Sequence, residues 1–327
     1  MKSTSALFLL LFIAITTSTQ AQQLGLSRLF YPNATLSANY VVPTNSATTP
    51  NFGLTRTSFL GIIPVQSEVQ GSVSLKKKFD LRAVHTVLIG QYTQLQPTIE
   101  GTNFPDNGYK TVSLGAIRMQ ASIKDRLWVY GAAIGMTESN ETIFTPQPFL
   151  WGGAARMRII GLRSQIIYGS ILTYNQKLRF VPVFGINQRL GKQWRATALL
   201  PFMVDVNYHP TKWFSMDALA GVNGYSGGFQ VQTAEEKLLR RQNYQHVKLG
   251  LSANLHLLTV FNISAEAGVA GFRQLRTFNG ARENLTSSTP PFAPYLGVSV
   301  RYLTSRSKFS SKFIGKFGLG DKGSVNF

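Results

Sequence analysis

Apolar and polar side chains alternate along most of this chain, in segments separated by turn-forming residues. From Val247 to Leu255 every second residue is Val, Leu or Ala, and the residues between them include Lys248 and Asn254. The segment from Phe261 to Val269 alternates in the same way. A period of two is that of a β-strand whose two faces meet different surroundings. The pattern therefore predicts an all-β chain.

The length of these segments indicates what kind of all-β protein this is. A soluble β-sandwich would alternate too, but soluble strands run to about 5–6 residues. The segments here persist for about ten residues, which is what a tilted strand needs to cross a bilayer. Short turns alternate with long polar connections, the turns at 124–126, 191–192, 209–212 and 256–259 and the connections at 97–110, 137–148, 232–243 and 277–290. Such an alternation is typical of the periplasmic turns and extracellular loops of a single antiparallel transmembrane β-barrel.

The strand count follows from placing each alternating segment. We expect strands at 33–42, 54–76, 82–94, 111–123, 127–136, 149–159, 163–174, 178–188, 193–200, 202–209, 213–231, 244–255, 260–275 and 292–303. This is about 14 strands, within a range of about 12 to 16, and an even count puts both ends of the barrel on the periplasmic side. A short helical turn is expected at 234–241, inside one of the long connections.

The N-terminus predicts export. Lys2 precedes an uninterrupted apolar run from Ala6 to Ile15, followed by small and polar residues up to Ala21. The run is too short to span a bilayer, for which about 20 residues are needed, and has the form of a signal peptide cleaved after Ala21. The expected organisation is a signal peptide at 1–21, a barrel at 22–303 and a basic tail at 304–327.

A family resemblance agrees with this architecture. Its residues are Gly, Pro, aromatic and turn positions, namely Pro182, Gly185, Trp194, Leu200-Pro201, Tyr208, Trp213, Gly227-Gly228-Phe229, Arg240-Arg241, the segments 247–250 and 265–268, and the last strand from Pro294 to Tyr302. The pattern, which covers roughly the C-terminal half, resembles a family of uncharacterised, porin-like outer-membrane β-barrel proteins of Gram-negative bacteria. The resemblance implies the fold and an outer-membrane location. It implies no catalytic or binding residues, because the family is a domain of unknown function.

Composition narrows the classes of function. Lys and Arg outnumber Asp and Glu by 33 to 14, which gives a net charge of +19, and such a charge favours a polyanionic partner such as nucleic acid, an anionic membrane or lipopolysaccharide. On the expected strands much of this charge falls on interior positions and on the tail, so nucleic acid is not expected as a partner. The chain has no Cys, which excludes disulfides, thiolate nucleophiles and zinc sites of Cys type.

The side chains expected to face the interior are the main functional clue. The basic ones are Arg118, Arg156, Arg163, Arg179, Arg195, Lys248 and Arg301. Their acidic and polar partners are Asp205, Asp217, Glu266, His85 and His246. Rings of Arg and Lys favour anionic solutes, so one hypothesis is a passive channel or solute-uptake barrel with a basic lumen. The other is a structural or interaction barrel whose lumen is closed by paired side chains, since interior charges need partners where water is scarce.

Enzymatic function is not expected. A lipid-modifying enzyme or protease would need a nucleophile and a base supported by an acidic group, and neither His85 nor His246 has a convincing Ser or carboxylate at its depth. Phosphate-binding, dinucleotide and calcium-binding motifs are not found in the sequence, and no cofactor or metal is expected.

The tail after Leu303 is basic. Lys-Phe pairs recur at 308–309, 312–313 and 316–317. On a helix they would form an amphipathic segment for an anionic membrane surface or a periplasmic partner, and the alternative is a disordered tail. The expected partners of the whole protein are thus outer-membrane lipid and lipopolysaccharide, a small solute that is anionic if the lumen is basic, and a periplasmic partner of the tail.

Overall fold

The computed structural model describes residues 32–46, 49–74, 77–99, 108–122, 126–139, 146–161, 164–175, 177–211, 213–232, 237–257, 260–281 and 283–303. All helices and strands that the structure assigns in these ranges are β-strands. No helix among them is long and apolar enough to cross a membrane. The predicted signal peptide with its cleavage at Ala21, Arg163 and the basic tail all lie outside the described residues.

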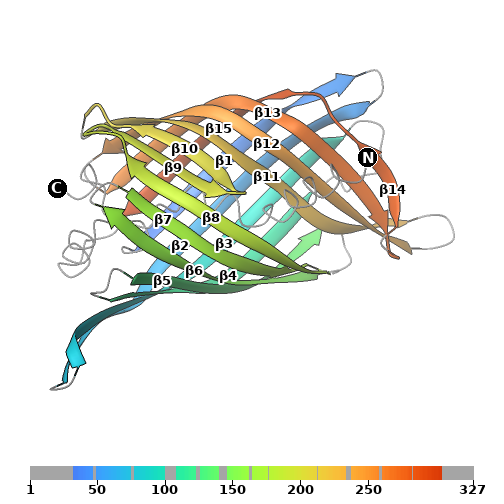
Figure 1. Ribbon diagram of the computed structural model, residues 1–327. Helices are drawn as coiled ribbons and strands as arrows, with labels where there is room; N and C mark the ends of the chain where they lie inside the picture. Colours follow the sequence, from blue (N-terminus) through green and yellow to red (C-terminus); the bar gives the residue numbers. More distant parts are fainter. Residues whose placement is uncertain are drawn as a thin grey trace, which may run out of the picture.

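Fifteen strands make up one antiparallel sheet (Figure 1). Their bounds are β1 Asn33–Ser46, β2 Thr49–Ser74, β3 Lys77–Ile99, β4 Tyr109–Ser122, β5 Arg126–Ser139, β6 Gln147–Gly161, β7 Ser164–Tyr174, β8 Leu178–Arg189, β9 Trp194–Leu200, β10 Met203–Tyr208, β11 Phe214–Gln232, β12 Lys237–Leu257, β13 Phe261–Asn279, β14 Asn284–Ser288 and β15 Ala293–Leu303. Each predicted strand overlaps one of these, and only β14 was not expected.

The sheet closes on itself. Strands β1 to β13 pair in chain order, β1 also pairs with β15, and β13 pairs with both β12 and β15. Because β14 pairs only with β13, outside this ring, the barrel proper has 14 strands. The predicted antiparallel barrel of about 14 strands is confirmed.

The two ends of the barrel differ. Asn33 of β1 lies opposite Leu303 of β15, so the barrel begins and finishes at one end, which we call the turn end. The connections there are short, at 75–76, 123–125, 162–163, 190–193, 209–213 and 258–260. The opposite, loop end carries the longest connections, at 100–108, 140–146 and 280–292, but its connections at 47–48, 175–177 and 201–202 are as short as turns. The prediction of a long connection at 232–243 is wrong, because β12 already begins at Lys237. The predicted helical turn at 234–241 is wrong for residues 237–241, which are part of this strand.

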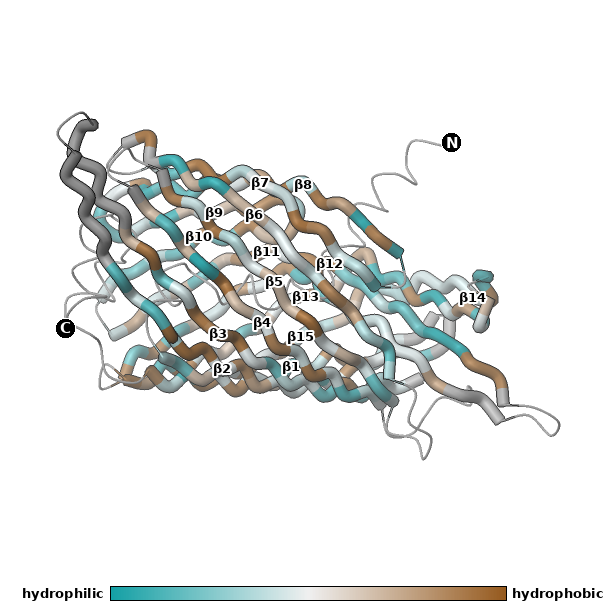
Figure 2. Tube along the Cα trace, turned by 90° about the horizontal axis from the view of Figure 1, so that it is seen from below, coloured by the Kyte–Doolittle hydropathy of each residue, from teal (hydrophilic) through white to brown (hydrophobic). Residues whose placement is uncertain are grey.

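The outer surface is apolar. Outward side chains such as Leu114 and Ile134 are exposed, at 66% and 64% of their area, and brown and teal residues succeed one another along the strands in Figure 2. Outward aromatic side chains lie near the turn end: Trp194 stacks on Tyr208 at 4.4 Å between ring centroids, and Phe261 lies 5.2 Å from Tyr302. A closed barrel with an apolar exterior and an aromatic girdle is the form in which β-strands cross a membrane. The chain is an outer-membrane β-barrel.

The barrel wall is short at strands β9 and β10. Strand β9 has 7 residues and β10 has 6, whereas β11 has 19 and β12 has 21. Pro201 follows β9 directly and has no N–H to continue the ladder. Seven residues in a tilted strand rise about 18 Å, less than the apolar band of about 25 Å that such barrels present to lipid. Gly221, opposite Met203, is the last residue of β11 that pairs with β10, and beyond it β11 leaves the wall.

The freed part of β11 and its partner on β12 turn into the barrel. Val222 and Val247 belong to the faces that point outward nearer the turn end, yet here they pack with the inward side chains Val181 and Val183 of β8. Phe202, at the tip between β9 and β10, joins the same cluster. An outward face that meets the inward face of another wall shows that these strands lie inside the lumen. We call residues 222–232 and 237–248 the β11–β12 plug.

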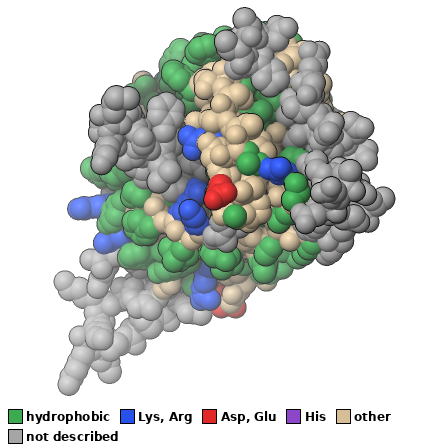
Figure 3. All heavy atoms as spheres, turned by 90° about the vertical axis from the view of Figure 1, so that its right-hand side faces the viewer, with side chains coloured by type: hydrophobic (Ala, Val, Ile, Leu, Met, Phe, Trp, Pro, Cys, Tyr) green, Lys and Arg blue, Asp and Glu red, His purple; other side chains and the backbone are tan. Residues whose placement is uncertain are grey.

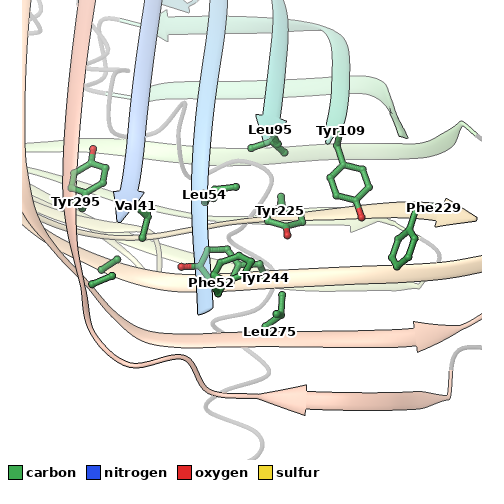
Figure 4. Packing of buried hydrophobic residues seen from close by; sticks show 12 residues of the cluster. Val41, Phe52, Leu54, Leu95, Tyr109, Tyr225, Phe229, Tyr244, Leu275 and Tyr295 are labelled. Atoms are coloured by element: carbon green, nitrogen blue, oxygen red, sulfur yellow. The ribbon is translucent and has the colours of Figure 1, made fainter. Parts of the chain in front are cut away.

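The other face of the plug packs against the opposite wall. Figure 4 shows β2, β3 and β4 ending over β11 and β12, with Phe52, Leu95 and Tyr109 pointing at them. The rings of Phe52 and Tyr244 lie 4.4 Å apart, and those of Tyr109 and Tyr225 lie 5.5 Å apart. At Gly227 a Cβ atom would stand 2.4 Å from the Tyr109 ring, so only glycine allows this approach. The plug thus spans the lumen from wall to wall.

A β-bulge changes which side chains of β13 face inward. Val247 pairs with Gly271 but Gln245 pairs with Gln274, so two residues of β13, one more than in regular pairing, lie opposite His246. Phe272 takes the positive φ of 50° there and points outward. Residues before the bulge face inward at even positions, whereas Arg273 and Leu275 after it are buried. This change of phase is what a bulge produces.

Candidate functional site in the barrel interior

A row of inward-facing positions crosses the barrel on neighbouring strands. The register places side by side Arg189, Arg195, Asn207, Asp217, Ser252, Glu266, Gly297, Asn39 and Arg56, on strands β8 to β13, β15, β1 and β2. Partners in an antiparallel register point to the same face. The row therefore forms one continuous polar band on the inner wall.

Glu266 of this band forms an ion pair with Lys248, which lies outside the row on β12, opposite Ala270. Lys248 Nζ lies 2.7 Å from Glu266 Oε1 and 3.0 Å from Oε2, and only 4% of Lys248 is exposed. Lys248 also donates to the Tyr295 hydroxyl at 3.1 Å, which in turn donates to Asn39 Oδ1 at 3.0 Å. The network links β12, β13, β15 and β1, and the Glu266 carboxylate neutralises the charge of Lys248 within the protein.

Asp217 is held mainly by amides. Asn207 Nδ2 donates to Asp217 Oδ1, and Asn254 Nδ2 donates to Asp217 Oδ2 at 2.7 Å. Ser264 Oγ donates to Asn254 Oδ1 at 2.6 Å. Arg195 lies one strand further along, where its Nε donates to Asn187 Oδ1 at 3.1 Å. The structure thus brings Asp217 and Arg195 into one polar row with Asn207 between their strands.

The remaining predicted interior residues lie at several depths. Arg179 and Asp205 face inward on β8 and β10, by the alternation of exposure along those strands. Arg301 is buried near the turn end, and its Nε donates to Thr35 Oγ1 at 3.2 Å. His85 is buried on β3, with Nδ1 2.5 Å from Ser67 Oγ of its register partner, so the expectation that His85 has no Ser at its depth is wrong. These basic groups are spread along the interior and do not form one ring.

The expectation that Arg118 and Arg156 line the lumen is wrong. Arg118 belongs to the exposed face of β4, while Ile117 and Met119 beside it are buried. Arg156 points outward, with its guanidinium carbon 5.7 Å from the Trp128 ring centroid and 5.9 Å from that of Tyr168.

The physical reason is that polarity does not mark the lumen on this side of the barrel. Here the inner wall carries an apolar cluster of buried residues, made of Leu60, Ile62, Ala83, Val87, Ile89, Ile117, Met119, Ala121, Leu127 and Met157. An Arg in the aromatic girdle can place its guanidinium against aromatic rings in the interfacial region while its aliphatic stem lies along apolar surface. Both faces of β4 and β6 are thus largely apolar, and the charge sits on the outer one.

Arg273 is an interior residue that the sequence does not reveal. Only 1% of it is exposed, and it faces inward because of the bulge. Its Nη1 donates to Thr44 Oγ1 at 2.6 Å and to the Pro291 carbonyl at 2.9 Å, and its Nη2 donates to the Phe52 carbonyl at 2.5 Å. All these acceptors are uncharged. The only available signal was the loss of strict alternation after Val269, where Ala270, Gly271 and Phe272 interrupt the pattern.

Comparison with known proteins finds distantly similar β-barrels. No family model and no curated protein matches the chain. Among solved structures, an outer-membrane channel from Pseudomonas putida F1 is similar at 9% identity and a TM-score of 0.39, over 84% of this chain and 95% of that chain. A mutant of the Rh. blastica porin is similar at 7% identity and a TM-score of 0.31, over 84% and 98%. The β domain of a Bordetella autotransporter is similar at 9% identity and a TM-score of 0.29, over 83% and 98%.

Membership of the uncharacterised outer-membrane family that the sequence resembles stays a prediction. The barrel and its place in the outer membrane follow from the strand ring and the apolar exterior described above.

The interior as a whole combines a polar band with a plug. Figure 3 views the loop end and shows Lys and Arg side chains near the middle of that face, together with an acidic side chain and among hydrophobic and uncharged ones. The described lumen is not a water-filled tube lined by arginines, because the plug crosses it and Lys248 and Arg273 are bonded within the protein. Movement of the plug would be required before the polar band could line a continuous path.

Proposed function

We propose that this protein is a gated solute channel of the outer membrane, and that the β11–β12 plug is its gate in the closed position. The observation that carries the proposal is the packing of Val222 and Val247 against the inner face of β8, on the lumen side of the wall. A structural wall strand would keep its outward face toward lipid. These two strands instead place both faces inside the protein.

The plug has features that suit a gate better than a permanent core. Its residues include polar side chains such as Arg241, Gln242, Gln245 and His246, all buried. Its contacts to the walls include hydrogen bonds: Arg241 Nη2 donates to Asn175 Oδ1 at 2.7 Å, and Arg56 Nη1 donates to Asn223 Oδ1 at 3.3 Å. A net contribution of about 1 kcal/mol for each such bond is small enough for a reversible movement. When displaced, the same polar side chains would line a hydrated lumen.

Conductance of tethered variants tests the gate. The chain has no Cys, so the double variant Y109C/G227C carries the only two thiols, at a contact between plug and wall. We expect rare openings from the untethered protein in planar bilayers and more frequent ones from Y109A, which loses the ring against Gly227. A short bifunctional thiol reagent should silence Y109C/G227C. T111C/T137C, which joins two register partners within the wall, serves as the matched control and should keep its openings.

The two outcomes that contradict the proposal are distinct. Equal conductance of tethered and untethered Y109C/G227C would mean that the plug is not the gate. No conductance from any folded variant would leave the alternative, a non-conducting structural or interaction barrel. The closed lumen itself favours that alternative, because nothing in it requires the plug to move.

We also infer that the protein is not an enzyme. The inference rests on the sequence, which has no Cys nucleophile and only 4 His residues. The contact between Ser67 and His85 offers the most direct check. Hydrolysis of phospholipid or peptide by the folded protein, lost in S67A, would contradict the inference.

The partners remain proposals. The apolar exterior supports outer-membrane lipid, and the interior supports a small solute. We do not propose nucleic acid as a partner. Lipopolysaccharide and a periplasmic partner of the basic tail stay predictions from the sequence.

A further inference from the structure

A group of nitrogen-bearing side chains meets where the plug faces β2. Arg56 of β2 reaches Asn223 of β11, and Asn223 lies opposite His246 in the register of β11 and β12. Lys248 is the next inward residue after His246. Both Lys248 and His246 lie within electrostatic range of the Arg56 guanidinium. We call Arg56, Asn223, His246 and Lys248 the cationic cluster.

His246 is the residue that points to a ligand. Only 3% of it is exposed, and neither ring nitrogen has a hydrogen-bond partner in the part of the chain that the structure describes. Its ring packs on one side against Tyr244, at 5.2 Å between centroids. Leaving a buried polar group without a partner costs about 1–3 kcal/mol. Such groups in native proteins usually mark a bound water, ion or ligand.

The charges around His246 indicate the sign of that ligand. Three cations of the described interior lie near it, Arg56, Lys248 and Arg273, and Glu266 is bonded to one of them, Lys248. Arg273 donates to uncharged acceptors. A low-dielectric region with more positive than negative charge attracts an anion. Guanidinium and imidazole N–H groups match the oxygens of carboxylate and phosphate.

We propose that the cationic cluster binds a small oxyanion, a carboxylate or a phosphate, with an N–H of His246 as a donor. The inference gives the solute of the proposed channel a chemical class and a resting site between the plug and β2, so its biological meaning rests on the proposed function. The binding itself does not require conduction.

Thermal unfolding of the full-length protein in detergent micelles measures the binding. Inorganic phosphate and acetate are titrated separately against sodium chloride of equal ionic strength. We expect at least one of the two oxyanions to raise the unfolding midpoint to a plateau that chloride does not reach, and the better one identifies the class. H246F should weaken the apparent affinity by about tenfold, the effect of losing one charge-assisted hydrogen bond. R195A, which removes an inward cation outside the cluster, should keep the affinity.

A second measurement does not depend on a folded variant. The chain has only 4 His residues, so labelled imidazole nitrogens of the unmodified protein can be followed by NMR during the same titration. A saturable shift of one buried His signal supports the proposal. Absence of any oxyanion effect beyond chloride would overturn it, and so would equal affinities of H246F and the unmodified protein. Binding without conductance would contradict the channel alone, and conductance without binding would contradict the site alone.

Discussion

Arg273 Nε donates a hydrogen bond to the hydroxyl of Tyr244 at 3.0 Å, across the bulge that separates β13 from β12. The guanidinium carbon also lies 5.8 Å from the Tyr244 ring centroid and 5.3 Å from that of Phe52. One side chain thus joins the plug to β1, β2 and the segment before β15. The bulge at Phe272 is what turns Arg273 inward, so a local irregularity of one strand supports the closure of the lumen.

Truncation of Arg273 should destabilise the barrel strongly. R273A removes the buried donors of four hydrogen bonds, and we expect a loss of about 3 kcal/mol or more in the free energy of unfolding. R273K keeps the charge but not the planar fork, so it should lie between R273A and the unmodified protein. Denaturant unfolding in lipid vesicles measures both. A loss below about 0.5 kcal/mol for R273A would contradict the role assigned to this residue.

The pair of Lys248 and Glu266 should show strong coupling. E266Q leaves the buried ammonium without its carboxylate, and breaking such a pair costs about 3–5 kcal/mol. K248M/E266L replaces both charges by apolar groups and should recover most of that loss. The single variants K248M and E266L complete a double-mutant cycle with K248M/E266L, and their unfolding free energies give the coupling. If E266Q and K248M/E266L were equally unstable, the cost would not come from the uncompensated charge.

The outward placement of Arg156 can be tested by probes in the Cys-free background. A polarity-sensitive fluorophore on R156C should be quenched by lipids that carry a quencher on their acyl chains, because this position lies among Trp128 and Tyr168 on the lipid side. The same fluorophore on R195C, an inward position, should not be quenched. Quenching at both positions or at neither would be inconsistent with the register described here.

The close approach at Gly227 predicts a contrast between two glycines. In G227A the new methyl would meet the Tyr109 ring at 2.4 Å, and overpacking of this kind costs about 1–3 kcal/mol. In G152A the nearest atom stands at 3.6 Å, an ordinary contact, and we expect a change within about 0.5 kcal/mol. Unfolding free energies of the two variants decide the matter. Equal values would show that the plug does not sit tightly against β4.

Much of the fold is readable from the residues one segment at a time. Alternation with a period of two is a local property, and it located the 14 strands of the ring and the end at which the barrel begins and finishes. It failed at 237–241, where charged residues suggested a loop helix, because the burial of Arg241 depends on Ser226 and Asn175 far along the chain.

The site depends on contacts that no local pattern contains. By itself the sequence determined an all-β barrel with an apolar exterior and Lys248 and Glu266 on the inner face, since each of these follows from the phase of one strand. Only the tertiary structure decided that Arg156 faces lipid, because both faces of its strand are largely apolar. Only the tertiary structure turned Arg273 inward and carried β11 and β12 across the lumen. A bulge shifts the phase of all later residues, and a short neighbour such as β10 frees the strand beside it, so both effects arise between strands.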